Sequence, residues 1–575
     1  RRRTSQAQYP VQRTRMNASG RQLMAEPPAS AESSDQSSES PKIVRHKVSA
    51  PSGDGSVYVD PPLEELDALI ASNVRRRASY DYDVQGRSLS ELGTLARREL
   101  VAEAVTYTSR YRTVDAPRDV DKLFLAGHQP QMFHPGVWVK NFALAEIARK
   151  AGATPINLVI DSDAVKSTSI AVPSGTREHP HLDHVSFDEH SVGIPFEDRP
   201  IRDRAMFDSF GDRAAERIAG LVADPLLRTF WPRVLGRAHE TNNLGASLAE
   251  ARHQVEGDWG LQTLELPQSR VCQTEAFAWF AAHVLAHLPR FWDVYNDTVH
   301  EYRRVYRLRS ADHPVPDLES SDGWLEAPLW LWSADKPVRR RLFARQRGDE
   351  LVVTDRRELE FSLDMTADGD AEKAVEQLRA LSDRGIRLRT RALLTTLFAR
   401  TVACDLFLHG IGGGKYDELT DVIASRFFGF ALPRLVVLSG TLRLPIARSP
   451  MDGQTTGDNP LRSLHQRLRE LEFHPERFLD GQSNETAAIV AQKERWIATP
   501  ATHDNARERW RAIRQSNAEL QPFVEQQRRQ WLGRRDELRD RLTAERVLGR
   551  RDFAFCLYPS SNLRKFLLEF RALDF

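Results

Sequence analysis

Two short segments carry residue types that could bind and activate a small molecule. The first, Gly127-His128-Gln129-Pro130, follows a buried-strand pattern and precedes a helical one. His128, Gln129 and the nearby His134 would offer hydrogen-bond donors or acceptors just before a helix N-terminus, where backbone N–H groups attract anions. A phosphate or carboxylate would fit there. In the alternative interpretation, both histidines only satisfy backbone groups of the loop.

The second segment is rich in glycine and follows a strand-like run from Cys404 to His409. Four glycines would let backbone N–H groups approach a ligand, and Lys415 adds a positive charge beside them. The spacing is that of neither a Walker loop nor a dinucleotide fingerprint, because Lys415 stands where the third glycine is required. A purely structural turn is the alternative. The segment comprises His409, Gly410, Ile411, Gly412, Gly413, Gly414, Lys415, Tyr416 and Asp417.

Asp161 and Asp163 end the strand pattern that follows the first helix. Both would lie on the same side of that strand, where a metal, an amine or a ribose hydroxyl could be held. Helix capping is the alternative role for these aspartates. We therefore predict one site, with catalytic candidates His128, Gln129, His134, Asp161 and Asp163. Its predicted binding residues are Gly127, Lys140, Arg389, His409, Gly410, Gly412, Gly413, Gly414, Lys415, Tyr416 and Asp417.

Two other groups of residues leave their role open. Arg387, Arg389 and Arg391 alternate as one face of a strand would, and could clamp a carboxylate bidentately or form a solvated face. A second group has metal-ligating side chains but no strong ligand spacing, so we expect a solvated loop and assign no metal site. That group is His179, His181, Asp183, His184 and His190.

The elements that would position these residues repeat a strand–loop–helix pattern. A strand at 122–126, a helix at 138–151 and a strand at 155–160 form a βαβ unit, which predicts a parallel sheet with ligands at its carboxyl edge. A second unit has a strand at 404–409, a helix at 418–428 and a strand at 435–438. The predicted fold class is α/β, a Rossmann-like doubly wound parallel sheet with inserted segments and a C-terminal helical coiled-coil hairpin.

The chain divides into seven expected segments. They are a disordered N-terminal segment (1–57), a helical segment (58–118), the first half of the Rossmann-like core (119–175), inserted helical and small β segments (176–365), the second half of the core (366–458), a helical hairpin or coiled coil (459–548) and a C-terminal segment that returns to the core (549–575). The hairpin carries apolar residues at a 4-3 spacing from Ala506 to Leu538, interrupted by Pro522, and predicts a homodimer.

Composition limits the functional classes. The 575 residues are 41% apolar, and 81 Lys and Arg balance 80 Asp and Glu, so we expect no nucleic acid or membrane partner. Three cysteines without CxxC spacing fit a reducing compartment. No apolar run approaches the roughly 20 residues of a membrane span. We expect a cytoplasmic protein, although the basic first 21 residues could belong to a transit peptide or a mis-assigned start.

The same segments resemble the cysteine-adding enzymes of bacillithiol biosynthesis, the BshC family. Residues 127–136 are similar to that family's TGQQ-x-GLFTGP loop and keep Gly127, Gln129 and Phe133. Residues 160–163 stand where the family has an acidic EDHD stretch. Residues 389–415 resemble its LRP…GGPGE segment, and residues 557–564 its FP-x-x-x-LQER motif. The resemblance runs from about residue 121 to the C-terminus and is thin between these motifs.

The resemblance implies a Rossmann-like core, a C-terminal coiled coil and a ligase-like activity that joins the carboxyl group of cysteine to a glucosaminyl-malate amine. An activated acyl group is then required, so ATP or another nucleotide is the candidate cofactor. Backbone N–H groups with His128 or Lys415 would stabilise the developing charge. The chain departs from the family at His128, Pro130, the acidic stretch and Lys415, so another acceptor or reaction is an open alternative. A catalytically silent nucleotide- or sugar-binding protein and a metal-dependent hydrolase are the others.

Overall fold

The structure is a computed structural model that describes residues 42–46, 48–115, 117, 119–190, 193–447, 460–479, 481 and 483–572. Most of the segment predicted to be disordered, residues 1–41 and 47, lies outside this range. The chain forms two compact units. The core unit comprises residues 1–172, 184–445 and 551–575, and the helical unit comprises residues 173–183 and 446–550.

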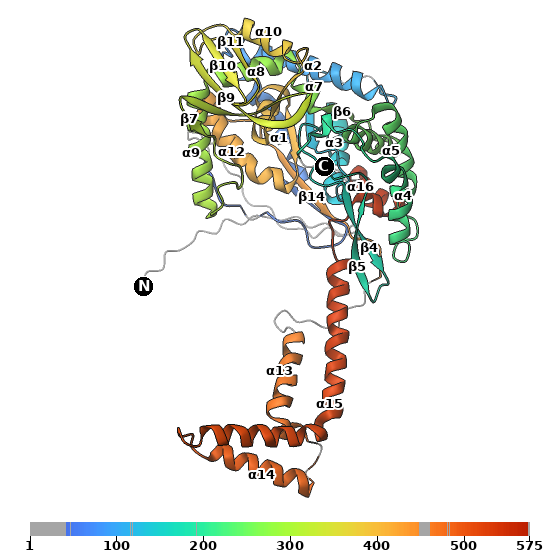
Figure 1. Ribbon diagram of the computed structural model, residues 1–575. Coiled ribbons are helices and arrows are strands. Elements are labelled where there is room, and N and C mark those ends of the chain that lie inside the picture. Colours follow the sequence, from blue (N-terminus) through green and yellow to red (C-terminus); the bar gives the residue numbers. More distant parts are fainter. Residues whose placement is uncertain are drawn as a thin grey trace, which may run out of the picture. The chain divides into compact units, whose positions relative to one another are not determined.

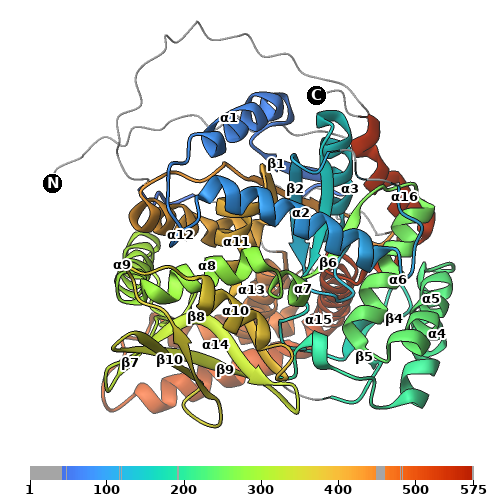
Figure 2. The same ribbon diagram turned by 90° about the horizontal axis from the view of Figure 1, so that it is seen from above.

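A six-stranded sheet forms the centre of the core unit, in the order β1-β14-β13-β2-β3-β6. Figure 2 labels β1, β2 and β6 of this sheet. Five of its strands run parallel, and β1 pairs antiparallel with β14. This arrangement confirms a mixed α/β fold with a parallel sheet. The strands are β1 (Ser56–Asp60), β2 (Leu123–His128), β3 (Thr154–Val159), β6 (Leu264–Pro267), β13 (Leu406–His409) and β14 (Val436–Thr441).

The strand β1 starts inside the segment that the sequence predicted to lie outside the fold. Ser56 pairs with Thr441 and Asp60 with Val437, so the sheet gains a strand on its β14 side. The run Val57-Tyr58-Val59 has β-forming residues, but it is too short to be recognised as a strand without its partner. The boundary predicted at residue 57 therefore falls within a strand.

Helices cover both faces of this sheet. Leu123 and Leu125 of β2 belong to the main hydrophobic cluster, together with buried residues of α2 (Leu89–Thr108), α8 (Glu275–Ala286), α11 (Ala392–Phe398) and α12 (Ile411–Phe428). Successive side chains of a strand point to opposite faces, so Phe124 and Ala126 face the side on which α3 (Pro135–Ala151) packs. Coverage on both faces explains why all of Leu123–Ala126 is buried.

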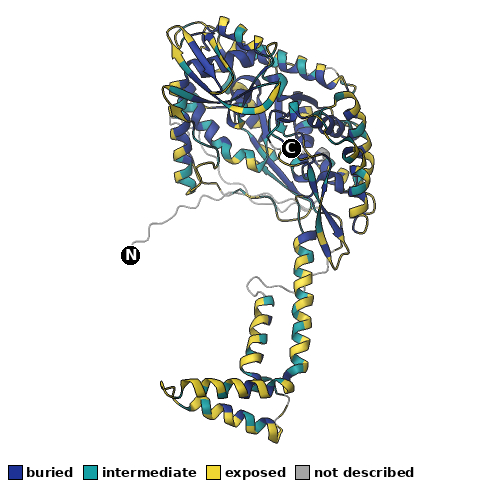
Figure 3. Ribbon diagram, in the orientation of Figure 1, coloured by how far each residue is buried: buried dark blue, intermediate teal, exposed yellow. Residues whose placement is uncertain are grey.

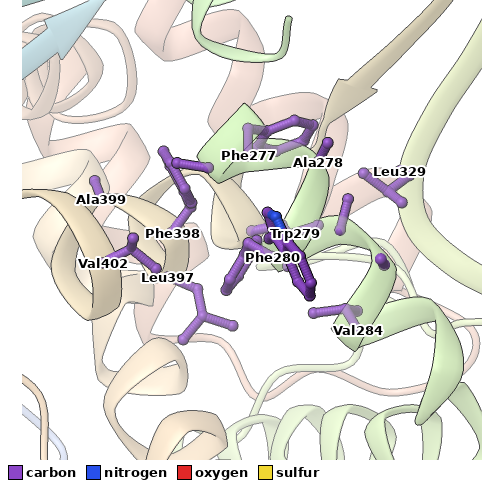
Figure 4. Packing of buried hydrophobic residues seen from close by; sticks show 14 of the residues in the cluster. Phe277, Ala278, Trp279, Phe280, Val284, Leu329, Leu397, Phe398, Ala399 and Val402 are labelled. Atoms are coloured by element: carbon purple, nitrogen blue, oxygen red, sulfur yellow. The ribbon is translucent and has the colours of Figure 1, made fainter. Parts of the chain in front are cut away.

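Aromatic residues fill the centre of the main cluster (Figure 4). The ring of Phe398 lies 5.6 Å from that of Phe277 and 5.3 Å from that of Phe280, both in edge-on geometry. Edge-to-face pairs of this kind stabilise a core beyond the area that they bury. The residues Phe277, Phe280, Val284, Leu285 and Leu288 are all buried in this core.

A second sheet of the core unit is antiparallel, in the order β11-β10-β9-β8-β12, with β7 (Ser320–Ser321) paired to β8. The small β segments that the sequence predicts within 176–365 include four of its strands, β8 to β11. The run of alternating arginines forms β12, and β12 pairs with β8 in this sheet although it was assigned to the second half of the core. The strands are β8 (Trp324–Ser333), β9 (Lys336–Arg347), β10 (Glu350–Thr354), β11 (Glu360–Asp364) and β12 (Ile386–Thr390).

The inserted region is mainly helical, as predicted. Further strands and helices complete the core unit. The strands β4 (Ser169–Gly175) and β5 (Pro180–Ser186) form a two-stranded sheet. The C-terminal α16 (Ser560–Leu568) packs against α3. The remaining helices are α1 (Leu66–Ala78), α4 (Arg204–Ile218), α5 (Leu227–Thr241), α6 (Leu244–Asp258), α7 (Gln268–Val271), α9 (Leu288–Tyr306) and α10 (Glu372–Ala380), with the short η1 (Leu63–Glu65), η2 (Phe196–Asp198), η3 (Ala399–Ala403), η5 (Phe555–Leu557) and η6 (Glu569–Ala572).

The helical unit contains α13 (Pro460–Phe473), η4 (Pro475–Phe478), α14 (Asn484–Ala498) and α15 (Ala506–Leu548). Both α13 and α14 pack against α15. The apolar seam is buried at Leu520 and Val524. Pro522 lies inside α15, which changes direction along its length (Figure 1). Most residues of these helices are exposed or half-buried (Figure 3).

In the described part of the chain, none of the helices has the length and apolar character needed to cross a membrane.

Candidate functional site

Two histidine-ended strands lie next to each other at the carboxyl edge of the central sheet. The neighbours β2 and β13 pair in parallel and end at His128 and His409. A helix begins shortly after each strand: α3 at Pro135, with His134 at its N-cap, and α12 at Ile411, with Gly410 at its N-cap. The structure therefore places two helix N-termini, which favour anions, after adjacent strand ends.

The segment predicted to be a glycine loop forms the first turns of α12. Of these glycines only Gly410 is extended, with φ −78° and ψ 165°, and α12 already includes Gly412, Gly413 and Gly414. A side chain at Gly413 would overlap the His409 ring, and one at Gly414 would overlap Val437. Close packing therefore accounts for these two glycines. Glycine's low helix propensity favoured a loop in the sequence, and tertiary packing overrode it.

Lys140 supplies a buried ammonium group to this edge. It lies in the second turn of α3, is 3% exposed, and donates from Nζ to the carbonyl oxygen of Gly127 at 2.6 Å. Burial, with a smaller effect of Arg252, lowers the pKa of Lys140 to about 8. An ammonium has three N–H donors, and one of them is used here. An anionic ligand would accept hydrogen bonds from the remaining donors and stabilise the charged form.

The three histidines are neutral near pH 7. Burial, followed by Lys140, lowers the pKa of His128 to about 3. Burial lowers the pKa of His409 to about 4, against an opposing effect of Asp417. Burial and Arg551 lower the pKa of His134 to about 4. The positive charge of this edge therefore comes from Lys140, and the imidazoles act as neutral donors or acceptors.

Two ring nitrogens at this edge lack hydrogen-bond partners within the described residues. They are Nδ1 of His134 and Nε2 of His409, both of which are buried. The latter lies 3.8 Å from Asp417 Oδ2, beyond hydrogen-bond distance. By contrast, Nδ1 of His128 lies 3.1 Å from the carbonyl oxygen of Gln129. Buried polar atoms are usually paired, so these two nitrogens are exceptions at this edge.

Gln129 and Asp163, which the sequence assigned to one site, are in contact. Gln129 Nε2 donates to Asp163 Oδ2 at 3.1 Å, and Arg339 Nη1 donates to Asp163 Oδ1 at 3.0 Å. The guanidinium of Arg339 stacks over Trp330 at 4.8 Å. Arg339 was not predicted as a site residue, because it stands in the consecutive run Arg339-Arg340-Arg341, which reads as an ordinary charged strand.

Asp161 belongs to a separate buried cluster. Its carboxylate accepts from Ser269 N at 2.9 Å and Ser269 Oγ at 2.5 Å. Burial and the charge of Glu197 raise the pKa of Asp161 to about 7. A carboxyl group that titrates near neutrality can serve as a general acid or base. The two predicted aspartates thus have different partners, although both follow β3.

Arg389 forms the predicted bidentate clamp, but its carboxylate is the protein's own. Nε and Nη2 of Arg389 donate to the two oxygens of Glu197 at 2.9 and 2.8 Å. The pair is nearly inaccessible to solvent. Arg389 therefore fixes η2 to β12 and is not free for a ligand. Glu197 was not recognised, because it lies in a short turn far from β12 in the chain.

The last three residues of the glycine segment, Lys415, Tyr416 and Asp417, lie in surroundings that differ from one another. Lys415 has an exposed side chain, and the structure gives that side chain no partner among the described residues. Tyr416 is half-buried, and burial raises its pKa. Asp417 is buried and pairs with Arg400 at 2.8 Å. The cation that the sequence analysis assigned to Lys415 is thus supplied at this edge by Lys140.

A buried charge network lies behind Lys140. Arg252 Nη1 pairs with Glu256 at 2.5 Å, and its Nη2 donates to Glu265. Asn157 on β3 donates to Glu265 at 2.7 Å. The i, i+4 spacing of Arg252 and Glu256 was a readable signal on a helix. This network anchors α6 to the sheet, and Arg252 contributes to the lowered pKa of Lys140.

The histidine-rich run forms no metal centre in the described structure. Its one close pair joins His181 Nε2 to Asp183 Oδ1 at 3.7 Å. Throughout the part of the chain that the structure describes, no group of three or more His, Cys, Asp or Glu side chains is arranged to hold a metal ion.

No protein-family model matches this chain, and no curated protein matches it.

Proposed function

We propose that the carboxyl edge between β2 and β13 binds the anionic part of a small-molecule substrate or nucleotide. The observation that carries this proposal is Lys140, a buried ammonium group beside the N-termini of α3 and α12. Burying an ammonium costs free energy unless a negative charge compensates it. The free ring nitrogens of His134 and His409 support the same interpretation.

The strand order supports a Rossmann-like assignment. In chain order the parallel strands are β2, β3, β6, β13 and β14, and in the sheet they lie as β14-β13-β2-β3-β6. The chain thus moves outward from β2 in one direction and, after β6, continues from β13 in the other. In doubly wound sheets ligands bind where the order reverses, at the carboxyl ends of the strands. That point lies between β2 and β13.

We infer a ligase-like activity of the cysteine-adding type from the resemblance to the BshC family. A bound nucleotide would supply the energy that activates the carboxyl group of cysteine. The chain's own groups would hold its phosphates through the N–H groups of α3 and α12 and through Lys140. Asp161, with a pKa near 7, is a candidate to accept the proton of the attacking amine. Gln129, held by Asp163, is a candidate to orient the substrate.

Binding and turnover of the full-length chain test this proposal. Calorimetry with ATP, ADP and inorganic phosphate should give binding that Lys140→Met weakens by about ten- to a hundred-fold, the range expected for a lost charged hydrogen bond. Lys415→Met is the matched control, because its side chain is exposed. Mass spectrometry of cysteine, glucosaminyl-malate and ATP mixtures should show the amide product. Equal binding by wild type and Lys140→Met would overturn the site assignment.

A second candidate is a catalytically silent nucleotide- or sugar-binding protein that acts through its helical unit. Its support is the exposure of Phe473, Ile497, Trp510 and Phe523 on that unit. Binding without turnover would favour this candidate. In both cases we propose a cytoplasmic homodimer in which α15 contributes a coiled-coil contact.

A further inference from the structure

The backbone of Gln129, at the carboxyl edge of the central sheet, is fixed on both sides. Gln129 directly follows β2, and Pro130 disfavours helical conformations at the residue before it. The Gln129 carbonyl oxygen accepts from Gln131 N at 2.9 Å and lies 3.1 Å from Nδ1 of His128. The His128 carbonyl oxygen accepts from Ile160 N at 3.0 Å. The side chain of Gln129 therefore starts from a fixed point of the sheet edge.

The side-chain amide of Gln129 has a partner at one end only. Its Nε2 donates to Asp163 Oδ2 at 3.1 Å. A carboxylate accepts hydrogen bonds and donates none, so Asp163 selects the Nε2 end of the amide and turns Oε1 away from itself. Within the described residues Oε1 accepts no hydrogen bond, and it is not among the unpartnered atoms that are closed off from solvent. Gln129 is half-buried, so the edge presents an oriented acceptor that solvent reaches.

The carboxylate of Asp163 is itself held in one orientation. Its Oδ1 accepts from Arg339 Nη1 and from Ala164 N, both at 3.0 Å. The same Nη1 of Arg339 also donates to the carbonyl oxygen of Ser162 at 3.2 Å. With Oδ1 used in this way, Oδ2 is the oxygen that remains for Gln129. The carboxylate cannot turn without breaking the ion pair with Arg339.

Arg339 connects Asp163 to the antiparallel sheet. Its guanidinium stacks over the Trp330 ring at 4.8 Å, and that of Arg391 lies over the same ring at 4.3 Å. The side chain of Arg339 is 19% exposed, whereas its neighbour Arg340 is exposed, because successive residues of β9 point to opposite faces. The orientation of the Gln129 amide therefore depends on a residue of another sheet.

From this series of contacts we propose that Gln129 Oε1 selects ligands that carry a hydrogen-bond donor, an amine or a hydroxyl group, in addition to their anionic group. Arg339 is the positioning residue that fixes this oxygen through Asp163. The anionic group lies at the same edge, because Lys140 donates to Gly127, two residues before Gln129. The inference rests on the proposed function and names the substrate class, an amino acid or a hydroxy acid.

Calorimetry on the full-length chain with two matched pairs of carboxylic acids tests the proposal. L-Cysteine is paired with 3-mercaptopropionate, which lacks the amine, and L-malate is paired with succinate, which lacks the hydroxyl group. In at least one pair the acid with the donor should bind about ten-fold more tightly, because the acid without it leaves Oε1 unpaired. The ratio of the two affinities within a pair is the donor preference.

Asp163→Asn tests the orientation of the amide, because an Asn side chain both donates and accepts hydrogen bonds. The Gln129 amide can then turn over, and the donor preference should fall to about one, as it should in Gln129→Met. Arg339→Met should lower the preference by about three-fold or more, and Arg339→Lys, which keeps the charge, should restore part of it. Arg340→Met is the matched control and should keep the preference of the wild type.

Binding of inorganic phosphate separates this inference from the proposed function. Gln129→Met should bind phosphate as the wild type does, because Lys140 and the two helix N-termini are unchanged. If phosphate binding depends on Lys140 but the acids of each pair bind equally or not at all, this inference is overturned and the anion site stands. A donor preference that Asp163→Asn leaves unchanged also overturns it. Thermal unfolding verifies that each variant is folded, and Gln129→Met serves if Asp163→Asn fails that control.

Discussion

At the scale of single residues, Lys140 links stability to binding. Its pKa falls from 10.5 to about 8 in the folded chain. Between these values the unfolded chain holds a proton that the folded chain has lost. The free energy of unfolding contributed by this group therefore rises with pH across that window. Below pH 8 the buried ammonium group lowers the free energy of unfolding. A charged side chain that destabilises the fold in this way is a candidate for function.

We predict that Lys140→Met raises the free energy of unfolding by about 1–2 kcal/mol at pH 7, since removal of the buried charge outweighs the lost hydrogen bond to Gly127. Urea unfolding of both proteins at pH 7 and pH 10 measures this difference. The advantage of the variant should shrink at pH 10, where wild-type Lys140 is neutral. A variant that is less stable than wild type at pH 7 would contradict the prediction.

For Arg389 and Glu197 we expect substitution to destabilise the fold, unlike substitution of Lys140, because the charge of each residue compensates the buried charge of the other. Loss of one partner leaves a buried charge, so Arg389→Met should lower the free energy of unfolding by about 3–5 kcal/mol. The double variant Arg389→Met with Glu197→Met should recover most of that loss. Chemical unfolding of the two single variants and the double variant measures the coupling. If the double variant loses as much free energy of unfolding as the two single variants lose in sum, Arg389 and Glu197 are not coupled.

Contacts between predicted residues could be anticipated from sequence where the signal was local. Gln129 directly follows β2, and Asp163 lies four residues after the end of the neighbouring β3, so the two meet at the edge that a βαβ pattern predicts. Glu197 and Arg339 were missed because their partners lie 192 and 176 residues away in the chain. No periodicity of a local segment encodes such a pairing. Lys415 was predicted to belong to the site because a lysine beside glycines resembles a phosphate loop, and its side chain is exposed.

At the scale of elements, the start of α12 shows how packing decides secondary structure. Gly413 lies against the His409 ring, whereas the nearest atom to a side chain at Gly412 would be Tyr416 Oη at 3.5 Å. Both are helical, so a change to alanine gains helix propensity at both positions. The difference between the two variants therefore reports the contact with His409 alone.

We predict that Gly413→Ala lowers the free energy of unfolding by about 1–3 kcal/mol through overpacking. Gly412→Ala should be neutral or stabilise by up to about 1 kcal/mol. Thermal and urea unfolding measure both. Gly413→Ala should also weaken phosphate binding, because His409 and the first turn of α12 move apart. Equal stability of the two variants would show that the His409 ring can shift without cost.

The elements that were predicted correctly are those with strong periodicity and buried partners on both sides. The strands β2 and β3, with α3 between them, follow from the run 122–126 and the helical spacing after it. By contrast, β12 was assigned to the wrong sheet. Its alternation shows that it is a strand, but only its register with β8, Arg389 opposite Trp330, shows which sheet it joins.

At the scale of the whole molecule, exposed apolar side chains are unevenly distributed. Eight large hydrophobic residues are exposed among those described, and the four in the core unit are all valines. The helical unit carries Phe473, Ile497, Trp510 and Phe523, exposed by 44–57%. Exposed aromatic residues are enriched at interfaces, so this unit is the part of the chain that we expect to self-associate.

We predict that the full-length chain sediments as a dimer and that the double variant Trp510→Glu with Phe523→Glu sediments as a monomer. Two carboxylates placed in an apolar contact would lose their hydration without a partner, which costs several kcal/mol. Val338→Glu, on exposed β9 of the core unit, is the matched control and should remain dimeric. Sedimentation velocity over a hundred-fold concentration range distinguishes these states, with circular dichroism to verify helix content. A wild type that is monomeric at every concentration would show that no dimer contact exists. Dissociation by Val338→Glu alone would show that the dimer contact lies on the core unit and not on the helical unit, because only a charge placed inside the contact should separate the subunits.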